Sequence, residues 1–313
     1  MKKVRNPKFF IPLLIIIFLA AFPLFRPSIY LLSFLFTVFM YIALALSWNI
    51  IGGYAGYLSF GHVAFFGIGG YTTALLLKNL GLSPFYTAPA GGLLAAVLAV
   101  VAGYPCLRLR GPYFALVTLC LALAVHVVAL NVGWTKGAEG FWLPALPVNI
   151  FTDRAIFYET MLVLMLIIIF VVRWVEKSKL GIGLVCIRED EEVSQTIGIN
   201  ATVLKILAFA LSAFLTGIVG GIYSYYRTYI HPSIMFDTFI SITIVLMALF
   251  GGSRFWIGPL VGAGILSVVS ELLTIYIGAE IARILFGFLL AVVILFMPDG
   301  LMAYVRRPSK VPT

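Results

Sequence analysis

One polar stretch, Leu180 to Asn200, holds the residues of this chain that could form ion pairs and hydrogen bonds with a partner. Five consecutive charged residues, 188–192, stand there between two long hydrophobic segments. In so apolar a chain, this stretch is the first place to look for function.

The spacing inside this stretch predicts a short helix. Val193 and Ile197 are four residues apart, so they would share one apolar face. Arg188 and Glu192 have the same spacing, and an ion pair between them would add a little support. Gly198 is well placed as the residue just past the helix end. Such a helix either docks on a partner or lies in a linker or on the membrane surface.

The composition indicates the environment of the whole chain. Of its 313 residues, 62% are hydrophobic, the mean hydropathy is +1.11, and only 11% are charged. Soluble domains carry about 25% charged residues. Many long apolar runs are present, whereas a transmembrane barrel would show alternating segments of about ten residues. The sequence therefore predicts an all-α polytopic membrane protein.

About ten transmembrane helices are expected. The first apolar run lacks a convincing small-x-small cleavage site at its end, which favours a retained first span over a removed signal peptide. The eighth run is short and bounded by glycine, which leaves open whether it crosses fully. The predicted spans are residues 9–25, 29–50, 59–77, 86–104, 112–131, 158–174, 204–226, 238–252, 256–276 and 281–297.

The distribution of positive charge predicts the orientation. With a cytoplasmic N-terminus, 15 of the 21 Lys and Arg residues fall on the inside and 6 on the outside. This bias follows the positive-inside rule and places both termini and the polar stretch in the cytoplasm. The net charge of +9 therefore reflects topology and not nucleic-acid binding. Arg108 and Arg110, in a short inside turn, are interpreted as anchors at the lipid head groups.

Two segments are rich in glycine, 49–70 and 250–266. Glycine lets helices approach closely, and it also suits a broken or re-entrant helix beside a cavity. The two segments suggest a duplicated architecture, with both near a central pathway. The first is our candidate for the translocation pathway, with core packing as the alternative. The candidate pathway residues are Ser59, Gly61, His62, Phe65, Phe66, Gly69, Gly70 and Asn131.

Catalytic and metal-binding motifs are missing from the sequence. There is no Walker A, HExxH or GxSxG motif, and the three cysteines and three histidines are scattered. No catalytic residue, metal site or cofactor is therefore predicted. The spans also nearly lack ionisable residues, Glu271 being the main exception, which argues against coupling to protons or ions. A transporter of this kind needs energy from elsewhere, and a docking helix in the cytoplasm would supply that connection.

Three blocks carry a resemblance to a known family. They are GGYAGYLSFGHVAFFGIGGYTTALL (52–76), LRLRGPYFALVTL (107–119) and CIREDEEVSQTIGINATVLKILAFALSAFLTGIVGGIYS (186–224). The chain resembles, over nearly its whole length, the LivM-type permease subunits of branched-chain amino acid ABC importers. One departure is Lys136, in an external loop where relatives often have glycine.

The resemblance implies a single permease domain over residues 1–313, with the type II architecture of vitamin B12 importers. It implies a second permease subunit, expected as a heterodimer, two cytoplasmic ATP-binding subunits and an extracytoplasmic substrate-binding protein. The expected location is the plasma (inner) membrane of a bacterium or archaeon. It also implies that a cytoplasmic coupling loop, 175–203, contacts the ATPase. The residues expected in that contact are Ile187, Arg188, Glu189, Asp190, Glu191, Glu192, Gly198 and Asn200.

Two other functions remain open from the sequence. Related permeases serve urea or short amides, because specificity rests largely with the binding protein. A channel or ion-coupled carrier that works alone is the alternative from another class, although the sparse charge within the spans disfavours it.

Overall fold

Helices make up almost all of the regular structure in the computed structural model, which describes residues 7–296 and 300–302. Two short strands, β1 (Phe141–Trp142) and β2 (Tyr229–Ile230), are also present, as are two 3-10 turns in the loop after residue 131, Gly133–Thr135 and Gly137–Glu139. The other elements are α1 (Pro7–Ala21), the 3-10 turn η1 (Phe22–Phe25), α2 (Ile29–Asn49), the π-helical turn η2 (Ile50–Tyr54), α3 (His62–Leu80), α4 (Pro84–Cys106), α5 (Pro112–Asn131), α6 (Ile150–Lys177), α7 (Lys179–Glu189), α8 (Glu191–Thr196), α9 (Ala201–Arg227), α10 (Pro232–Met235), α11 (Thr238–Gly251), α12 (Ile257–Ile277) and α13 (Ala279–Phe296).

The long helices confirm the prediction of an all-α polytopic membrane protein. Within the described part of the chain, nine helices are long and apolar enough to cross a membrane. The first predicted span falls on a shorter apolar helix, Leu14–Phe25. The eighth is longer than the sequence indicated, because α10 and α11 together run from Pro232 to Gly251. Helix α6 begins at Ile150 and not near residue 158, with Asp153 placed favourably in its first turn.

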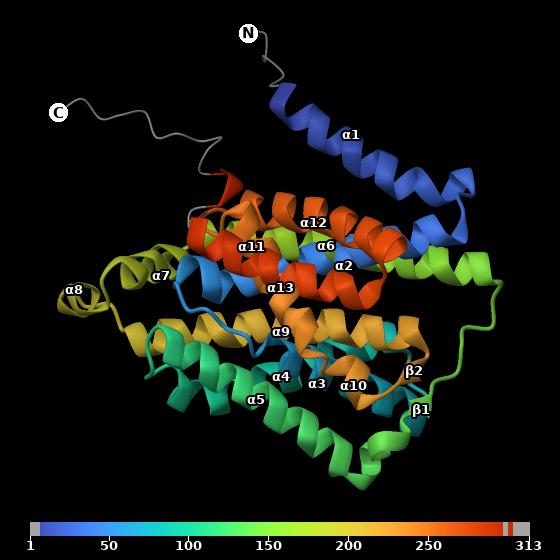
Figure 1. Ribbon diagram of the computed structural model, residues 1–313, viewed down its shortest axis with the longest axis horizontal. Coiled ribbons are helices and arrows are strands. Elements are labelled where there is room, and N and C mark those ends of the chain that lie inside the picture. Colours follow the sequence, from blue (N-terminus) through green and yellow to red (C-terminus); the bar gives the residue numbers. More distant parts are fainter. Residues whose placement is uncertain (1–6, 297–299, 303–313) are drawn as a thin grey trace.

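The helices form two layers (Figure 1). One layer holds α2, α6, α11 and α12, and the other holds α3, α4, α5 and α9. Helix α9 packs on α3 and α4, while α2 packs on α11 and α12. The predicted duplication of the architecture stays a prediction.

The two ends of the bundle differ. Helices α7 and α8 project from one end, and the strands β1 and β2 lie at the other (Figure 1). The strands pair antiparallel, with Phe141 opposite Ile230 and Trp142 opposite Tyr229. They tie the loop after α5 to the end of α9. The sequence did not predict this ribbon, because strands of two residues leave no periodic pattern.

Close packing explains several glycines in each of the two glycine-rich segments. A Cβ atom on Gly69 would overlap the carbonyl of Gly217 on α9, and one on Gly220 would overlap the carbonyl of Phe66 on α3. In the second segment, a Cβ on Gly251 would overlap the carbonyl of Gly258. The segments therefore bring α3 against α9 and α11 against α12.

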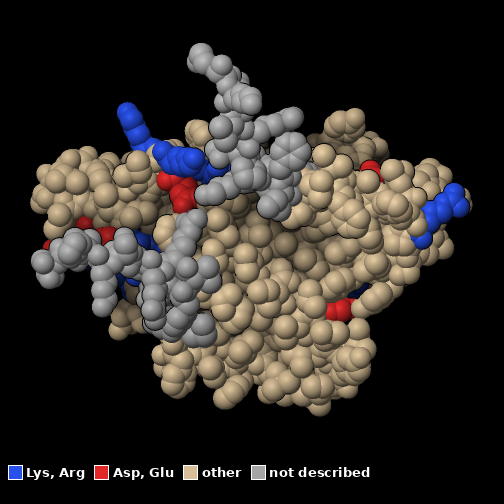
Figure 2. Space-filling view, turned by 90° about the horizontal axis from the view of Figure 1, so that it is seen from above, with Lys and Arg blue, Asp and Glu red and all other residues tan. Residues whose placement is uncertain are grey.

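The outer surface matches a lipid environment. Figure 2 shows one face on which charged side chains gather toward the two ends, with a broad uncharged surface between them. Large apolar side chains are exposed in the described part of the chain, such as Phe18 on α1, 56% exposed, and Phe288 on α13, 68% exposed. Apolar surface of this extent is stable against lipid or another subunit.

The glycine contact between α3 and α9 gives a direct test. We expect Gly69→Ala to destabilise the protein by about 1–3 kcal/mol, because the new methyl group forces α3 away from the backbone of α9. Gly264→Ala is the matched control, since a Cβ there meets nothing within 4 Å. Denaturation in mixed detergent micelles would measure both. Equal stability of the two variants would contradict the packing described.

Candidate functional site

The polar stretch folds into two helices, α7 and α8, that meet at Asp190. The backbone of Asp190 is extended, with φ −157° and ψ 114°, so the first helix ends there. Its side chain then caps α8, accepting hydrogen bonds from the backbone N–H of Glu192 at 2.9 Å and of Val193 at 3.0 Å. The predicted short helix is therefore present as α8, with α7 before it.

The predicted pair between Arg188 and Glu192 is wrong. The break at Asp190 puts the two residues on different helices, so they no longer share a face. Arg188 instead donates to the carbonyl of Gly53 at 2.8 Å and to Glu189 at 2.9 Å. Glu192 lies 3.8 Å from Arg110.

The end of α8 follows the prediction. Gly198 has a φ of +90°, a conformation that favours glycine. The N–H of Ile199 donates to the carbonyl of Ser194 at 3.1 Å, which closes the helix end. The Asn200 side chain then accepts from the N–H of Val203 at 3.1 Å and starts α9. Gly198 and Asn200 thus fix the path between two helices.

The apolar face of α8 has no cover within the described chain. Val193 is 57% exposed and Ile197 is 67% exposed. Around them, the side chains of Glu189 and Glu192 are 68% and 83% exposed. An apolar pair with acidic neighbours, held on a short ordered helix, suits contact with another protein.

A buried ion cluster fixes α8 to the rest of the bundle; we call it the Lys205 cluster. Lys205, on α9, donates to Glu191 at 2.7 Å, to the hydroxyl of Tyr57 at 3.0 Å and to the carbonyl of Leu107 at 3.3 Å. These bonds use all three ammonium donors. The second oxygen of Glu191 lies 3.2 Å from the Tyr57 hydroxyl and 3.3 Å from Arg110 Nε.

The Lys205 cluster joins three segments that are distant in sequence: α8, the segment 55–61 and the turn 107–111. Its burial is unequal, since the side chains of Lys205 and Glu191 are 5% and 12% exposed and that of Arg110 is 60% exposed. Arg110 therefore serves this contact and not only a lipid head group, which corrects the interpretation from sequence. Arg108 donates to the Tyr104 hydroxyl at 2.8 Å.

Electrostatics keeps the cluster charged. Burial raises the pKa of Glu191, but the hydrogen bond and charge of Lys205, together with the charge of Arg110, lower it further, so the net shift is downward. Burial raises the pKa of Tyr57 despite the nearby ammonium group. Glu191 thus stays ionised near neutral pH, and Tyr57 stays a hydrogen-bond donor.

Lys205, Tyr57 and their link to Glu191 were not predicted from the sequence. Lys205 counted only as one of the positive charges on the inside. A stronger signal was present, because a lysine one turn into an apolar helix needs a partner when it is buried. Its partner lies 14 residues earlier, and no helical spacing connects the two.

His62, at the start of α3, links three helices. Its Nε2 lies 2.7 Å from the hydroxyl of Ser212 on α9, and its Nδ1 lies 3.2 Å from that of Ser59. The Ser212 hydroxyl donates its single proton to the carbonyl of Ser47 on α2 at 2.6 Å, so it accepts from Nε2–H. Both ring nitrogens are therefore used for hydrogen bonds inside the bundle.

The segment 55–61 is not helical, yet its backbone is held by side chains. Trp48 Nε1 donates to the carbonyl of Ser59 at 2.8 Å, and the N–H of Phe60 donates to Thr118 at 3.2 Å. Such partners are needed wherever the backbone leaves the helical pattern within a membrane protein. The segment therefore runs as an ordered strap from Tyr57 in the Lys205 cluster to His62.

The candidate pathway residues divide into two groups. Those between Ser59 and Gly70 are buried inside the chain, where α3 meets α9. His62 and Phe65 are in ring contact, with centroids 5.7 Å apart. Asn131 lies apart, exposed at the end of α5, and donates to the carbonyl of Val127 at 2.8 Å. Their role in a pathway stays a prediction.

The buried pair of Glu191 and Lys205 predicts a particular pattern of stability. Glu191→Gln and Lys205→Met should each lower the free energy of unfolding by about 3–5 kcal/mol, because each leaves one buried charge without its partner. The double variant should cost less than the sum. Glu192→Gln, at a side chain 83% exposed, should change nothing measurable. Additive losses in denaturation experiments would refute the pairing.

The lowered pKa of Glu191 also predicts a dependence on pH. The folded state holds the carboxylate more acidic than its ordinary value of 4.5. Its contribution to stability is therefore present well above pH 4.5 and is lost as the pH falls through the lower, folded-state value. Unfolding midpoints of wild type and the double variant should converge in that acidic range; a constant gap would contradict the linkage.

Comparison with known proteins identifies the family. The family described as "Branched-chain amino acid transport system / permease component" matches residues 30–297. The permease LivM of Escherichia coli K12 is 28% identical over 302 residues, covering 87% of this chain and 69% of the relative. LivH of the same strain is 23% identical over 285 residues, covering 84% of this chain and 91% of the relative. A probable LivH of Methanocaldococcus jannaschii is 24% identical over 225 residues, covering 68% of this chain and 70% of the relative.

These matches agree with the fold and with the resemblance that the three sequence blocks carry. All three relatives are named as branched-chain amino acid transport permeases. No solved structure matches the chain significantly. An all-α chain with many membrane-crossing helices and this relationship is a transport permease and not an enzyme. The chain belongs to the family of branched-chain amino acid transport permease components, as a LivM-type subunit.

Proposed function

We propose that this chain is one of two permease subunits in an ATP-driven importer of branched-chain amino acids, and that its 175–203 loop docks on a cytoplasmic ATP-binding subunit. The observation that carries the docking proposal is the uncovered face of Val193 and Ile197, on a helix that the buried Lys205 cluster holds in place. Because α8 is held rigidly and has an apolar contact surface, it is suited to transmit movement from the ATP-binding subunit to the permease.

The assembly contains a second, different permease subunit, two ATP-binding subunits and an extracytoplasmic binding protein. The names of the relatives, which are LivM and LivH permeases of one transport system in the same strain, support two different permease subunits. The excess of Lys and Arg near α7 and α8 supports a cytoplasmic position for that end and for both termini. The membrane is the plasma membrane of a bacterium or archaeon, as the sources of the relatives suggest.

The coupling mechanism follows from the contacts of α8. Closure of the ATPase subunits displaces α8, and Glu191 passes the displacement to Lys205 on α9 and to Tyr57. Tyr57 begins the ordered strap that ends at His62, so α3 moves with it. Arg110, in the turn before α5, makes the same link to that helix. One helix thereby moves three others.

The uncovered face gives the decisive test. Val193→Glu and Ile197→Glu should abolish ATP-dependent uptake of labelled leucine by the reconstituted importer, because each places a charge in an apolar contact. They should also lower recovery of the ATP-binding subunits with the permease. The permease itself should unfold at the wild-type midpoint, since both side chains are exposed.

The matched control is Gln195→Glu, which adds the same charge to α8 on its opposite side. It should retain uptake. Substitutions of Glu191 are unsuitable for this purpose, because they also break the Lys205 cluster. Wild-type uptake by the Val193 and Ile197 variants would exclude α8 as the docking helix.

A further inference from the structure

A polar pocket opens at the end of the bundle opposite α7 and α8. Its volume is about 550 Å³, within the range of roughly 300–1,000 Å³ common for small-molecule sites. Five long elements contribute to it: α2, α9, α11, α12 and α13. Arg227 lies at its rim, at the end of α9, a helix about 40 Å long that begins beside α8. The site is therefore separate from the Lys205 cluster.

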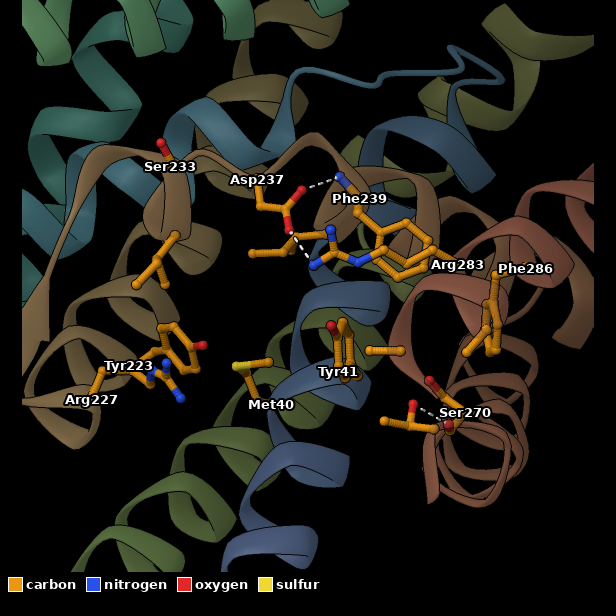
Figure 3. A pocket seen from close by; sticks show the side chains of 15 residues that line it. Met40, Tyr41, Tyr223, Arg227, Ser233, Asp237, Phe239, Ser270, Arg283 and Phe286 are labelled. Atoms are coloured by element: carbon orange, nitrogen blue, oxygen red, sulfur yellow. Dashed lines mark hydrogen bonds and ion pairs between the residues drawn. The ribbon is translucent and has the colours of Figure 1, made fainter. Parts of the chain in front are cut away.

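The pocket reaches well into the bundle. Tyr41, part of its wall, lies about 18 Å along α2 from Ile29, at roughly 1.5 Å per residue. Phe286 and Met40 add apolar surface at this depth. In Figure 3 the hydroxyls of Tyr41 and Tyr223 point toward the open centre. The pocket thus combines a polar mouth with a partly apolar floor.

Charges of both signs face each other across this space. Asp237 accepts from Arg283 at 3.2 Å, and its other oxygen accepts from the N–H of Phe239 at 3.0 Å. A carboxylate can accept further hydrogen bonds on both oxygens, so Asp237 keeps capacity for a cation. Figure 3 shows Arg227 on the side opposite Arg283.

Arg227 is the unusual member of the group. Its guanidinium group has no ion-pair or hydrogen-bond partner among the residues that the structure describes. Five donors in a planar fork match a carboxylate, which binds them in pairs. An unpaired arginine across a pocket from an acid–base pair is suited to a ligand that carries one negative and one positive group.

We propose that this pocket binds the zwitterion of an aliphatic α-amino acid, with its carboxylate on Arg227, its ammonium on Asp237 and its side chain toward Met40 and Phe286. The identity of the ligand rests on the proposed import function. The pocket is then the first site that the substrate meets after the binding protein releases it. No ionisable group is needed deeper in the bundle for this recognition step.

The test measures binding of tritiated leucine to the importer complex, purified with all permease and ATP-binding subunits but without the binding protein. Leucinol, which lacks the carboxylate, and 4-methylpentanoate, which lacks the ammonium group, serve as competitors. We expect wild type to prefer leucine over each by roughly tenfold or more, the scale of one lost charge-assisted hydrogen bond.

Arg227→Gln should weaken leucine binding by about the same factor and leave leucinol binding unchanged, so that the preference disappears. Asp237→Asn, which keeps the helix cap of α11, should likewise remove the preference over 4-methylpentanoate. Arg26→Gln, which removes a charge at the same end but outside the pocket, is the control and should bind leucine as wild type does.

The outcomes separate the two proposals. If the complete importer takes up leucine but Arg227→Gln retains wild-type preference for leucine over leucinol, the pocket inference is wrong. An equal loss for leucine and leucinol overturns it as well, because that pattern indicates structural damage. If the complete wild-type importer takes up no leucine, the proposed function fails instead.

Discussion

The ion pair between Lys205 and Glu191 is the interaction on which the structure of the α7–α8 end of this molecule depends. A lysine buried one turn into an apolar helix is costly unless its donors are used, and here three acceptors use them. Those acceptors belong to three segments that no local pattern would bring together. Only an arrangement that brings α8, the 55–61 strap and the 107–111 turn together supplies all three acceptors. The free-energy cost of burying the Lys205 charge therefore favours that arrangement over others.

Sequence patterns could predict features set by local physics. Long apolar runs predicted the helices. Gly198 predicted where α8 ends, and the spacing of Val193 and Ile197 predicted its apolar face. Glu271, the main ionisable exception within the predicted spans, accepts from the Tyr30 hydroxyl at 2.7 Å. Features set by tertiary contact could not be predicted from the sequence. They are the helix break at Asp190, the hydrogen bond from Lys205 to Tyr57, and the pocket at Arg227.

Helix α9 connects the two chemically active ends. Lys205, in its first turns, belongs to the ion cluster, and Arg227, its last residue, lines the pocket. Between them, Gly217 and Gly220 pack against the backbones of α4 and α3 with no side chain to absorb movement. A helix held so closely moves as a unit with its neighbours, because packed interiors transmit displacement and do not absorb it. The displacement of α8 that we propose would therefore reach the far end of α9.

The middle of α9 meets the neutral network of His62, Ser59 and Ser212. Charged groups there would be costly in the bilayer and would also hold a zwitterion too tightly to release it. Hydroxyl and imidazole dipoles can change partners without a net charge to bury. The separation of charge to the two ends, with dipoles between, thus agrees with our proposal that energy arrives through α8 and substrate enters from the far side.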